Sequence, residues 1–287
     1  MTLATEVVAI DLGELKRDFP SHPRLKGPIG PSCLLWVSPA LKHDFLAGKG
    51  NVYIRSVGSK APQNACFIIL SDHIELRLMF RQSDAMFILG AGANGNLDVR
   101  LNDKAPLAVI GDGLVTRGLR LAAHGREVII GAGCLIGEGS IIQGHDAHGI
   151  VEISSGRLLN SSDQVTELAP HVWLGKRAMV MPGRKIGKGT IVGAASVVTR
   201  DIPACSLAVG APARVVRRGV TWSRSRNIVD SEATKFISDL TSDERSVDND
   251  KISVANHISY ITTNVPKSAV LTIRRIRGAV IRILRRY

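Results

Sequence analysis

The sequence predicts an all-β protein, a parallel β-helix built from hexapeptide repeats, and three observations lead to this fold class. An aliphatic residue recurs at every sixth position from Leu168 to Val198 without a miss. A small residue follows most of these positions, as Gly175, Gly187 and Gly193 do. Aromatic residues make up only 4% of the 287 residues, so the core is expected to consist of aliphatic side chains.

The six-residue period decides between the regular structures. It is neither the 3.6-residue period of a helix nor the two-residue period of a free strand. In a hexapeptide repeat, six residues form one short flat strand and a corner, and three such units close one triangular coil. The aliphatic side chain points inward. The next residue is expected to be small, because the backbone turns tightly there and glycine adopts positive φ readily. The pairs Ile130-Gly131 and Ile136-Gly137 show the same spacing earlier, and Ile142 continues it.

The remaining segments are assigned from composition. Alternating apolar segments between residues 50 and 130, such as NVYIR and AMFILGAG, predict strands that continue the β-helix less regularly. Between the two repeat blocks, a polar stretch breaks the period and predicts a loop thrown out of a coil, where chemistry tends to be placed. The expected organisation is an irregular N-terminal cap (1–49), a β-helix domain (50–222) with its loop (144–166), a polar linker (223–265) and a basic amphipathic helix (266–287).

The C-terminal helix is expected from a stripe of apolar residues at steps of three and four. The stripe consists of Ala269, Ile273, Ile276, Val280, Ile283 and Tyr287, and arginines gather elsewhere, at positions 274, 275, 282, 285 and 286. Two interpretations stay open. The helix packs its apolar face on the β-helix or across subunits, or residues 267–287 make a peripheral contact with an anionic membrane.

Charge and cysteine content limit the function classes. Of the net charge of +12, eight units come from the segment after residue 250, which has no acidic residue, so the first 250 residues carry +4. A basic excess confined to a tail argues against nucleic acid as the partner. The four cysteines lie far apart without a CxxC pair, which argues against a disulfide framework and a thiolate zinc site. Without a signal-peptide pattern at the N-terminus or a stretch as long as a membrane span, a cytoplasmic location is expected.

The segment HVWLGKRAMVMPGRKIGKGTIVGAASVVTRDIPACSLAVGAPARVV (171–216) resembles a known family. Its VWLG element, PG turn, GAASVVTRDIP segment and GAPARVV closure are similar, in this order, to the signature of the hexapeptide-repeat O-acetyltransferases, in the branch that modifies sugars and polysaccharides. The resemblance covers about residues 105–222. It implies a left-handed β-helix, a homotrimer, and acetyl-CoA bound in the groove between neighbouring subunits.

The loop supplies the candidate catalytic residues. Residues 146–150 (DAHGI) resemble the SDxHxI loop of the polysaccharide-modifying branch, and they stand 25 residues before Trp173, counted from His148. The resemblance makes His148 the first candidate for the general base and His145, in a Gly-His pair, the second. A neutral imidazole takes the proton of a sugar hydroxyl as it attacks the thioester. Asp146 either holds the imidazolium and fixes its tautomer or bonds to the loop backbone. Direct transfer is expected, since no Ser-His-Asp nucleophile motif is present.

The same resemblance implies the residues that meet acetyl-CoA. Trp173 either walls the acyl or acceptor pocket or packs at a corner, and Gly175 follows in the same element. The coil at Gly193-Ala194-Ala195 is expected against the pantetheine arm, with Ala195 where the family has glycine. After Thr199, Arg200 replaces the family's lysine, as Arg214 does in the closure, and both arginines are expected to meet the CoA phosphates.

Two alternatives from other classes are kept. A metal hydratase of the gamma carbonic anhydrase type uses three histidines on this kind of β-helix, and four are available in number: His124, His145, His148 and His171. Zinc needs its ligands to face one point, and the VWLG and GAPARVV motifs resemble those of acyl transfer, so no metal is expected. The other alternative is a non-catalytic scaffold. The expected acceptor is a nucleotide sugar, a lipid-linked glycan precursor or a free saccharide.

Overall fold

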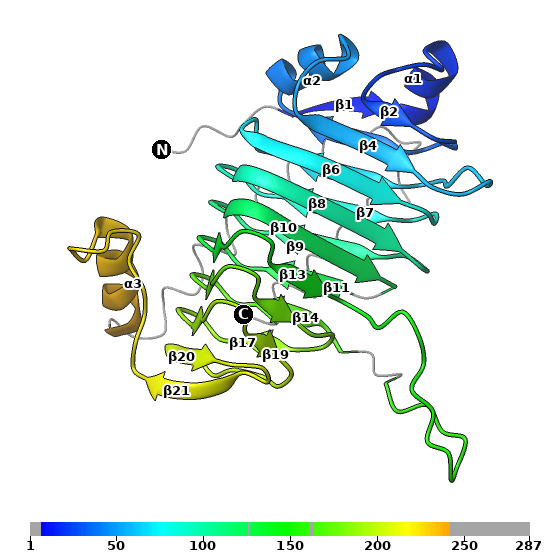
Figure 1. The fold of residues 1–287 in the computed structure, drawn as a ribbon. Helices are drawn as coiled ribbons and strands as arrows, with labels where there is room; N and C mark the ends of the chain where they lie inside the picture. Colours follow the sequence, from blue (N-terminus) through cyan, green and yellow to red (C-terminus); the bar gives the residue numbers. More distant parts are fainter. Residues whose placement is uncertain (1–6, 126, 161–163, 242–287) are drawn as a thin grey trace.

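The chain winds into a stack of parallel coils, as a computed structural model of residues 7–125, 127–160 and 164–241 shows (Figure 1). Two sheets run the length of the stack. The first, called the eight-stranded sheet below, contains β1 (Val8–Asp11), β3 (Leu34–Val37), β5 (Cys66–Ile69), β7 (Met86–Leu89), β9 (Leu107–Ile110), β11 (Glu127–Ile130), β14 (Thr166–Leu168) and β17 (Lys185–Ile186).

The second sheet begins with long strands and then divides. Its first strands are β2 (Leu25–Lys26), β4 (Val52–Ser56), β6 (Ile74–Phe80), β8 (Asn94–Asn102) and β10 (Val115–His124). One branch continues through β12 (Leu135–Ile136), β15 (Trp173–Leu174), β18 (Ile191–Val192), β20 (Ser206–Val209) and β21 (Arg214–Arg218). The other contains β13 (Ile141–Gln143), β16 (Met179–Val180) and β19 (Val197–Val198). The two halves of β10 pair with β12 and β13, so one long strand covers two faces of the coil below.

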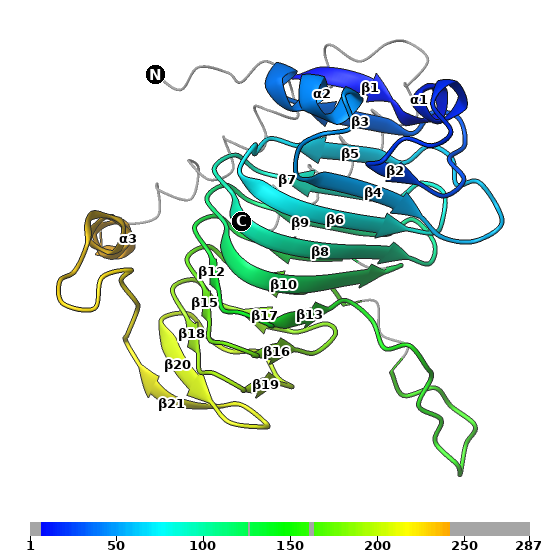
Figure 2. The same cartoon turned by 45° about the horizontal axis from the view of Figure 1, so that its top comes forward.

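Coil length changes along the stack (Figure 2). In the N-terminal half, Cys66 pairs with Met86, 20 residues later, and Met86 pairs with Leu107, 21 residues later. In the C-terminal half, Leu168 pairs with Ile186, 18 residues later, which is three hexapeptides. The six-residue period is therefore confined to the C-terminal half, because long strands such as β10 replace two short strands and their corner in the N-terminal half.

The predicted inward positions are confirmed. The six repeat aliphatics from Leu168 to Val198 are each at most 1% exposed and belong to one continuous core. Their β-branched and leucine side chains fill a narrow interior, so each contributes the full free energy of burial, about 1.5–3 kcal/mol.

Small residues after the aliphatics have a different cause from the expected one. A Cβ on Gly175 would lie 2.5 Å from the backbone nitrogen of Ala194 in the next coil, so close approach between coils requires the small residue. Positive φ occurs two residues after the small one instead, at Gly189 (φ 69°), and also at the non-glycine residues His171 and Ala195 (both φ 57°).

Replacing Ala195 by glycine is expected to raise the free energy of unfolding by about 1 kcal/mol, because alanine in left-handed backbone costs about 1–2 kcal/mol and glycine does not. Thermal unfolding of purified variants measures the change. Ala194→Gly is the matched control, since Ala194 is not among the positive-φ residues, and it is expected to be neutral or destabilising. Equal effects of the two substitutions would contradict this account.

The N-terminal segment is structured, which corrects the expectation of an irregular cap in residues 1–49. Asp11 caps α1 (Leu12–Asp18), with its carboxylate accepting from the amides of Gly13 and Glu14, and Ser38 caps α2 (Pro39–Leu46). Leu12 and Phe45 are buried on the end of the core. Strands β2 and β3 already join the two sheets, so the solenoid begins inside the expected cap.

The C-terminal part also contains more structure than expected. Strand β21 folds back antiparallel on β20, and α3 (Ser231–Thr241) lies within the expected linker. Residues 242–265 of that linker and the predicted amphipathic helix (266–287) lie outside the described residues. Within the described residues, no helix is long and apolar enough to cross a membrane.

Candidate active site

The loop between β13 and β14 projects from the stack (Figure 1). Residues at its two ends form one side of a pocket. This loop pocket has a volume of about 320 Å³. Its lining comes from both ends of the loop, from the PG turn and from the end of β19: Gly144, His145, Asp146, Leu159, Asn160, Gln164, Met181, Pro182, Gly183, Arg184 and Thr199.

Asn160 holds the ascending and descending arms of the loop together. Its Nδ2 donates to Asp146 Oδ2 and to the carbonyl of His148, both at 2.9 Å. Its Oδ1 accepts from the amide of Ile150 at 2.8 Å. Further out, Val151 and Leu158 pair as an antiparallel bridge. One amide side chain therefore holds the backbone at His148 and Ile150, and it also donates to the Asp146 carboxylate.

The base of the loop is closed by Thr166. Its hydroxyl donates to the carbonyl of Gln143 at 3.0 Å and accepts from the amide of Gly183 at 2.9 Å. The last residue before the loop, the first strand residue after it and the PG turn are thus tied to one buried oxygen.

The two candidate histidines have different environments. The His145 side chain is half-buried in the loop pocket, and its Nδ1 is buried without a hydrogen-bond partner among the described residues. His148 is exposed, and its side chain does not line the pocket.

Behind His145 lies a second histidine. His124 Nε2 lies 3.0 Å from Nδ2 of Asn102. Burial lowers the pKa of His124, and the neighbouring His145 lowers it further, against the attraction of Asp103. His124 is therefore neutral at pH 7 and adds no positive charge beside His145.

Arg184 places a positive charge at the rim of the loop pocket. Its guanidinium donates to the carbonyl of Pro182 at 3.0 Å and to Gln164 Oε1 at 3.3 Å. These acceptors are neutral, and among the described residues no carboxylate pairs with Arg184, so the pocket lining presents a guanidinium as well as the Asp146 carboxylate to a bound polar group.

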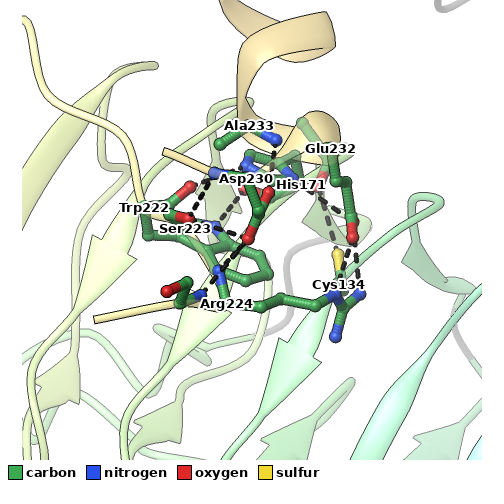
Figure 3. A network of polar contacts seen from close by, with 10 residues as sticks. Cys134, His171, Trp222, Ser223, Arg224, Asp230, Glu232 and Ala233 are labelled. Atoms are coloured by element: carbon green, nitrogen blue, oxygen red, sulfur yellow. Dashed lines mark hydrogen bonds and ion pairs between the residues drawn. The ribbon is translucent and has the colours of Figure 1, made fainter. Parts of the chain in front are cut away.

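Trp173 lies at a different corner of the coil, 37% exposed and 6.2 Å from Trp222 between ring centroids. Trp222 belongs to a cluster that holds α3 (Ser231–Thr241) against this corner (Figure 3). The His171 ring stacks between Trp222, at 4.3 Å, and Phe236 of α3, at 4.4 Å. Trp222 Nε1 donates to the carbonyl of His171 at 2.8 Å.

Charged groups complete the cluster around His171 (Figure 3). His171 Nδ1 lies 3.8 Å from Glu232, which also binds Arg224 at 2.6 Å. Asp230 accepts from the amide of Ala233 at 2.9 Å and thereby caps α3, and this bond and others hold the pKa of its carboxyl well below the usual range. Burial lowers the pKa of His171, against the Trp222 carbonyl and Glu232, which raise it.

The lowered pKa of His171 predicts a loss of stability in mild acid. The His171 imidazole binds a proton near pH 6.5 in the unfolded chain and only at lower pH in the folded chain. The free energy of unfolding therefore falls as the pH drops from about 7 through 6.5 towards the pKa of the folded state. The melting temperature should therefore fall more steeply between pH 7 and pH 5.5 in the wild type than in His171→Asn, which tolerates positive φ and does not titrate. If the melting temperatures of the two proteins change with pH in parallel, His171 is not the cause of the acid sensitivity.

The predicted cofactor residues are divided between the two corners. Thr199 lines the loop pocket and its carbonyl accepts from Arg184, whereas Gly175 adjoins Trp173 at the other corner. Arg200 and Arg214 are exposed, as Ala194 and Ala195 are. The single chain thus brings together His145, Asp146 and Thr199 but not Trp173. A second hollow of about 430 Å³ lies on the eight-stranded sheet, lined in part by the Asp201-Ile202-Pro203 segment.

Sequence reasoning missed Asn160, Thr166 and Arg184. Most of their partners lie 10 to 23 residues away, such as Ile150 for Asn160 and Gln143 for Thr166, and no local pattern marks such pairs. Arg184 follows the recognised PG turn directly, which is the one signal that would have pointed to it. Among the described residues, no three His, Cys, Asp or Glu side chains gather as a metal site.

Comparisons with known proteins agree with this architecture. No family model matches the chain. The chain is 28% identical over 108 residues to the polysialic acid O-acetyltransferase of Escherichia coli O1:K1, which covers 38% of this chain and 35% of that protein. It is 51% identical over 51 residues to a putative acetyltransferase of Staphylococcus aureus, covering 18% of this chain and 26% of that protein. The chain thus spans about a third or less of the length of these curated relatives.

Among solved structures, the polySia-specific acetyltransferase NeuO has the same fold, with a TM-score of 0.59 at 24% identity over 66% of this chain and 89% of that one. The parallel stack with its three-hexapeptide coils is therefore a left-handed β-helix. The left-handed β-helix that the resemblance predicted is confirmed, and over 108 residues the sequence is similar to that of a polysialic acid O-acetyltransferase.

Proposed function

We propose that this protein transfers an acetyl group from acetyl-CoA directly to a hydroxyl of a sugar or glycan precursor. The observation that carries the proposal is the DAHGI loop, clamped by Asn160 beside a polar pocket on a hexapeptide-repeat solenoid. Direct transfer requires both substrates to be bound together, which suits an open groove better than a closed acyl-enzyme site.

His148 is proposed as the general base, with His145 as the alternative. The imidazole takes the proton of the acceptor hydroxyl as its oxygen attacks the thioester carbonyl. Asp146 holds the loop through Asn160, so its carboxylate acts on the base through the backbone rather than by a direct bond to the ring. Arg184 is proposed to bind polar or anionic groups of the acceptor, because its charge lies at the pocket rim.

The acyl donor is proposed to lie between subunits of a homotrimer. Trp173 and the loop pocket occupy different corners of one chain, so a groove that uses both requires a neighbouring copy. In this arrangement Gly175, Gly193, Ala194 and Ala195 lie along the pantetheine arm, and Arg200 and Arg214 meet the CoA phosphates. The proposed location is the cytoplasm, where acetyl-CoA is available.

The test is an acceptor panel. Purified protein is incubated with acetyl-CoA and either polysialic acid, nucleotide sugars or free saccharides, and both thiol release and the mass of the acceptor are followed. Acetylation of one acceptor class, without bound zinc, supports the proposal. Stoichiometric zinc with CO₂ hydration would establish the hydratase instead, and neither activity in a folded protein would leave a scaffold.

A further inference from the structure

The outer face of the eight-stranded sheet is apolar and buried over its first part. One outward-facing residue per strand lies in register from β3 to β11, and all are at most 3% exposed: Trp36, Ile68, Ile88, Val109 and Ile129. Strands β5, β7 and β9 are buried at every position. An outer face in water alternates instead, as β4 does with Tyr53, which is 38% exposed.

The burial stops within the same row. After Ile129 the register continues to Glu167 and Lys185, which are half-buried and exposed. A neighbouring outward row contains Cys66, Met86 and Leu107. These residues form one cluster with the first four members of the first row, Trp36 to Val109, and this cluster is separate from the interior core. A cover therefore lies over the apolar part of this face and ends where charged residues begin.

The described residues do not supply this cover. Within residues 7–125, 127–160 and 164–241, the side chains that join the cluster belong to strands of the sheet or directly flank them, such as Val7, Leu70 and Ala91. Trp36 also has a buried Nε1 without a hydrogen-bond partner there. A buried indole N–H normally has an acceptor, so the covering group is expected to provide one.

We propose that the C-terminal segment 266–287 of the same chain docks on this face. The described chain leaves the solenoid beside it, because α3 packs on the corners that follow strands of this sheet. A Cβ on Gly133, after β11, would lie 3.3 Å from Glu232, and one on Gly189, after β17, would lie 2.6 Å from the Phe236 ring. Thr241 ends α3, and residues 242–265 provide the chain length to reach the face.

The dimensions and charges of the two surfaces match. The row from Trp36 to Ile129 crosses five strands, about 19 Å at the usual strand spacing. As a helix, the stripe from Ala269 to Ile283 is about 21 Å long. Glu127 starts the last covered strand and Glu167 follows the end of the row, whereas the segment after residue 250 carries eight basic and no acidic residues. Docking buries the apolar stripe, and the arginines then face solvent and the carboxylates of Glu127 and Glu167.

The labelling rate of the Cys66 thiol reports whether the face is covered, because Cys66 lies in the covered cluster. The experiment compares the full chain with a chain ending at Thr241, labels thiols with iodoacetamide, and quantifies each cysteine by peptide mass spectrometry. Cys33 and Cys134, buried in the interior, are the internal controls for folding, and half-exposed Cys205 controls for reagent access. Removal of the segment is expected to speed Cys66 labelling about tenfold or more, with Cys33 and Cys134 still protected.

Point variants keep the proposal testable if the shortened chain does not fold. Ile276→Ser with Ile283→Ser, on the apolar stripe, should expose Cys66, and the matched Arg275→Ser with Arg286→Ser should not. Cys66 that stays protected in the shortened, folded chain at all concentrations would overturn the proposal. Protection there that appears only at high concentration would assign the face to a second copy. Cys66 that becomes reactive in the full chain only when anionic vesicles are added would support the docking and show that lipid competes for the segment.

Discussion

Replacing His148 by alanine is expected to lower kcat for acetyl transfer by about 10²–10⁴-fold, because a sugar hydroxyl then loses the group that takes its proton. The change should leave the fold and CoA binding intact, since His148 is exposed and its backbone, rather than its ring, is held by Asn160. Steady-state kinetics on the acceptor found in the panel, with CoA binding by calorimetry, measure both quantities.

His145→Ala is the matched comparison, three residues away on the same loop. If this change abolishes turnover and His148→Ala does not, the base is His145, whose ring already lines the pocket. Full activity in both variants would rule out a histidine mechanism.

Replacing Ile186 by aspartate is expected to unfold or disassemble the protein, a loss of more than about 4 kcal/mol. Ile186 is 1% exposed and stacks on Leu168 of the coil before it, so the carboxylate would enter a narrow apolar interior that offers no partner. Circular dichroism and size-exclusion chromatography follow the loss.

The control for this prediction is one residue away. Lys185→Asp places the same carboxylate on the exposed side of the strand and is expected to fold normally. A soluble, cooperatively melting Ile186→Asp protein would show that the inward register is wrong.

The fold could be predicted from the sequence where each coil repeats the same six-residue pattern. Ile186 and Val192 are inward because six residues bring the chain back to an equivalent position, and sequence shows that directly. The N-terminal half was harder, since β10 bends over two faces without a corner and its coil has no six-residue period. The short helices α1 and α2 were missed because their caps, Asp11 and Ser38, lie among prolines and apolar residues that do not distinguish a helix from a loop.

The site was predictable in part, for a similar reason. A local motif marks Asp146 and His148, whereas the clamp by Asn160 joins residues far apart in the chain. At Ala195 the sequence showed an extra methyl group but not the positive φ that makes it costly, because φ follows from the shape of the corner. In the proposed trimer, the residues that meet CoA come from neighbouring copies, and one chain's sequence does not encode that geometry locally.

The closure at Thr166 has a consequence for how such proteins diversify. The coils on either side of the loop stay in register, Ile142 with Val180 and Leu168 with Ile186, and Thr166 joins the two ends of the insertion to the PG turn. Residues 145–160 of the intervening segment make backbone hydrogen bonds only within the loop, and none of these belongs to the ladders between coils. Over evolutionary time a lineage can lengthen, shorten or exchange it in a single genetic event, and so remodel the walls of the pocket while every rung of the solenoid keeps its sequence.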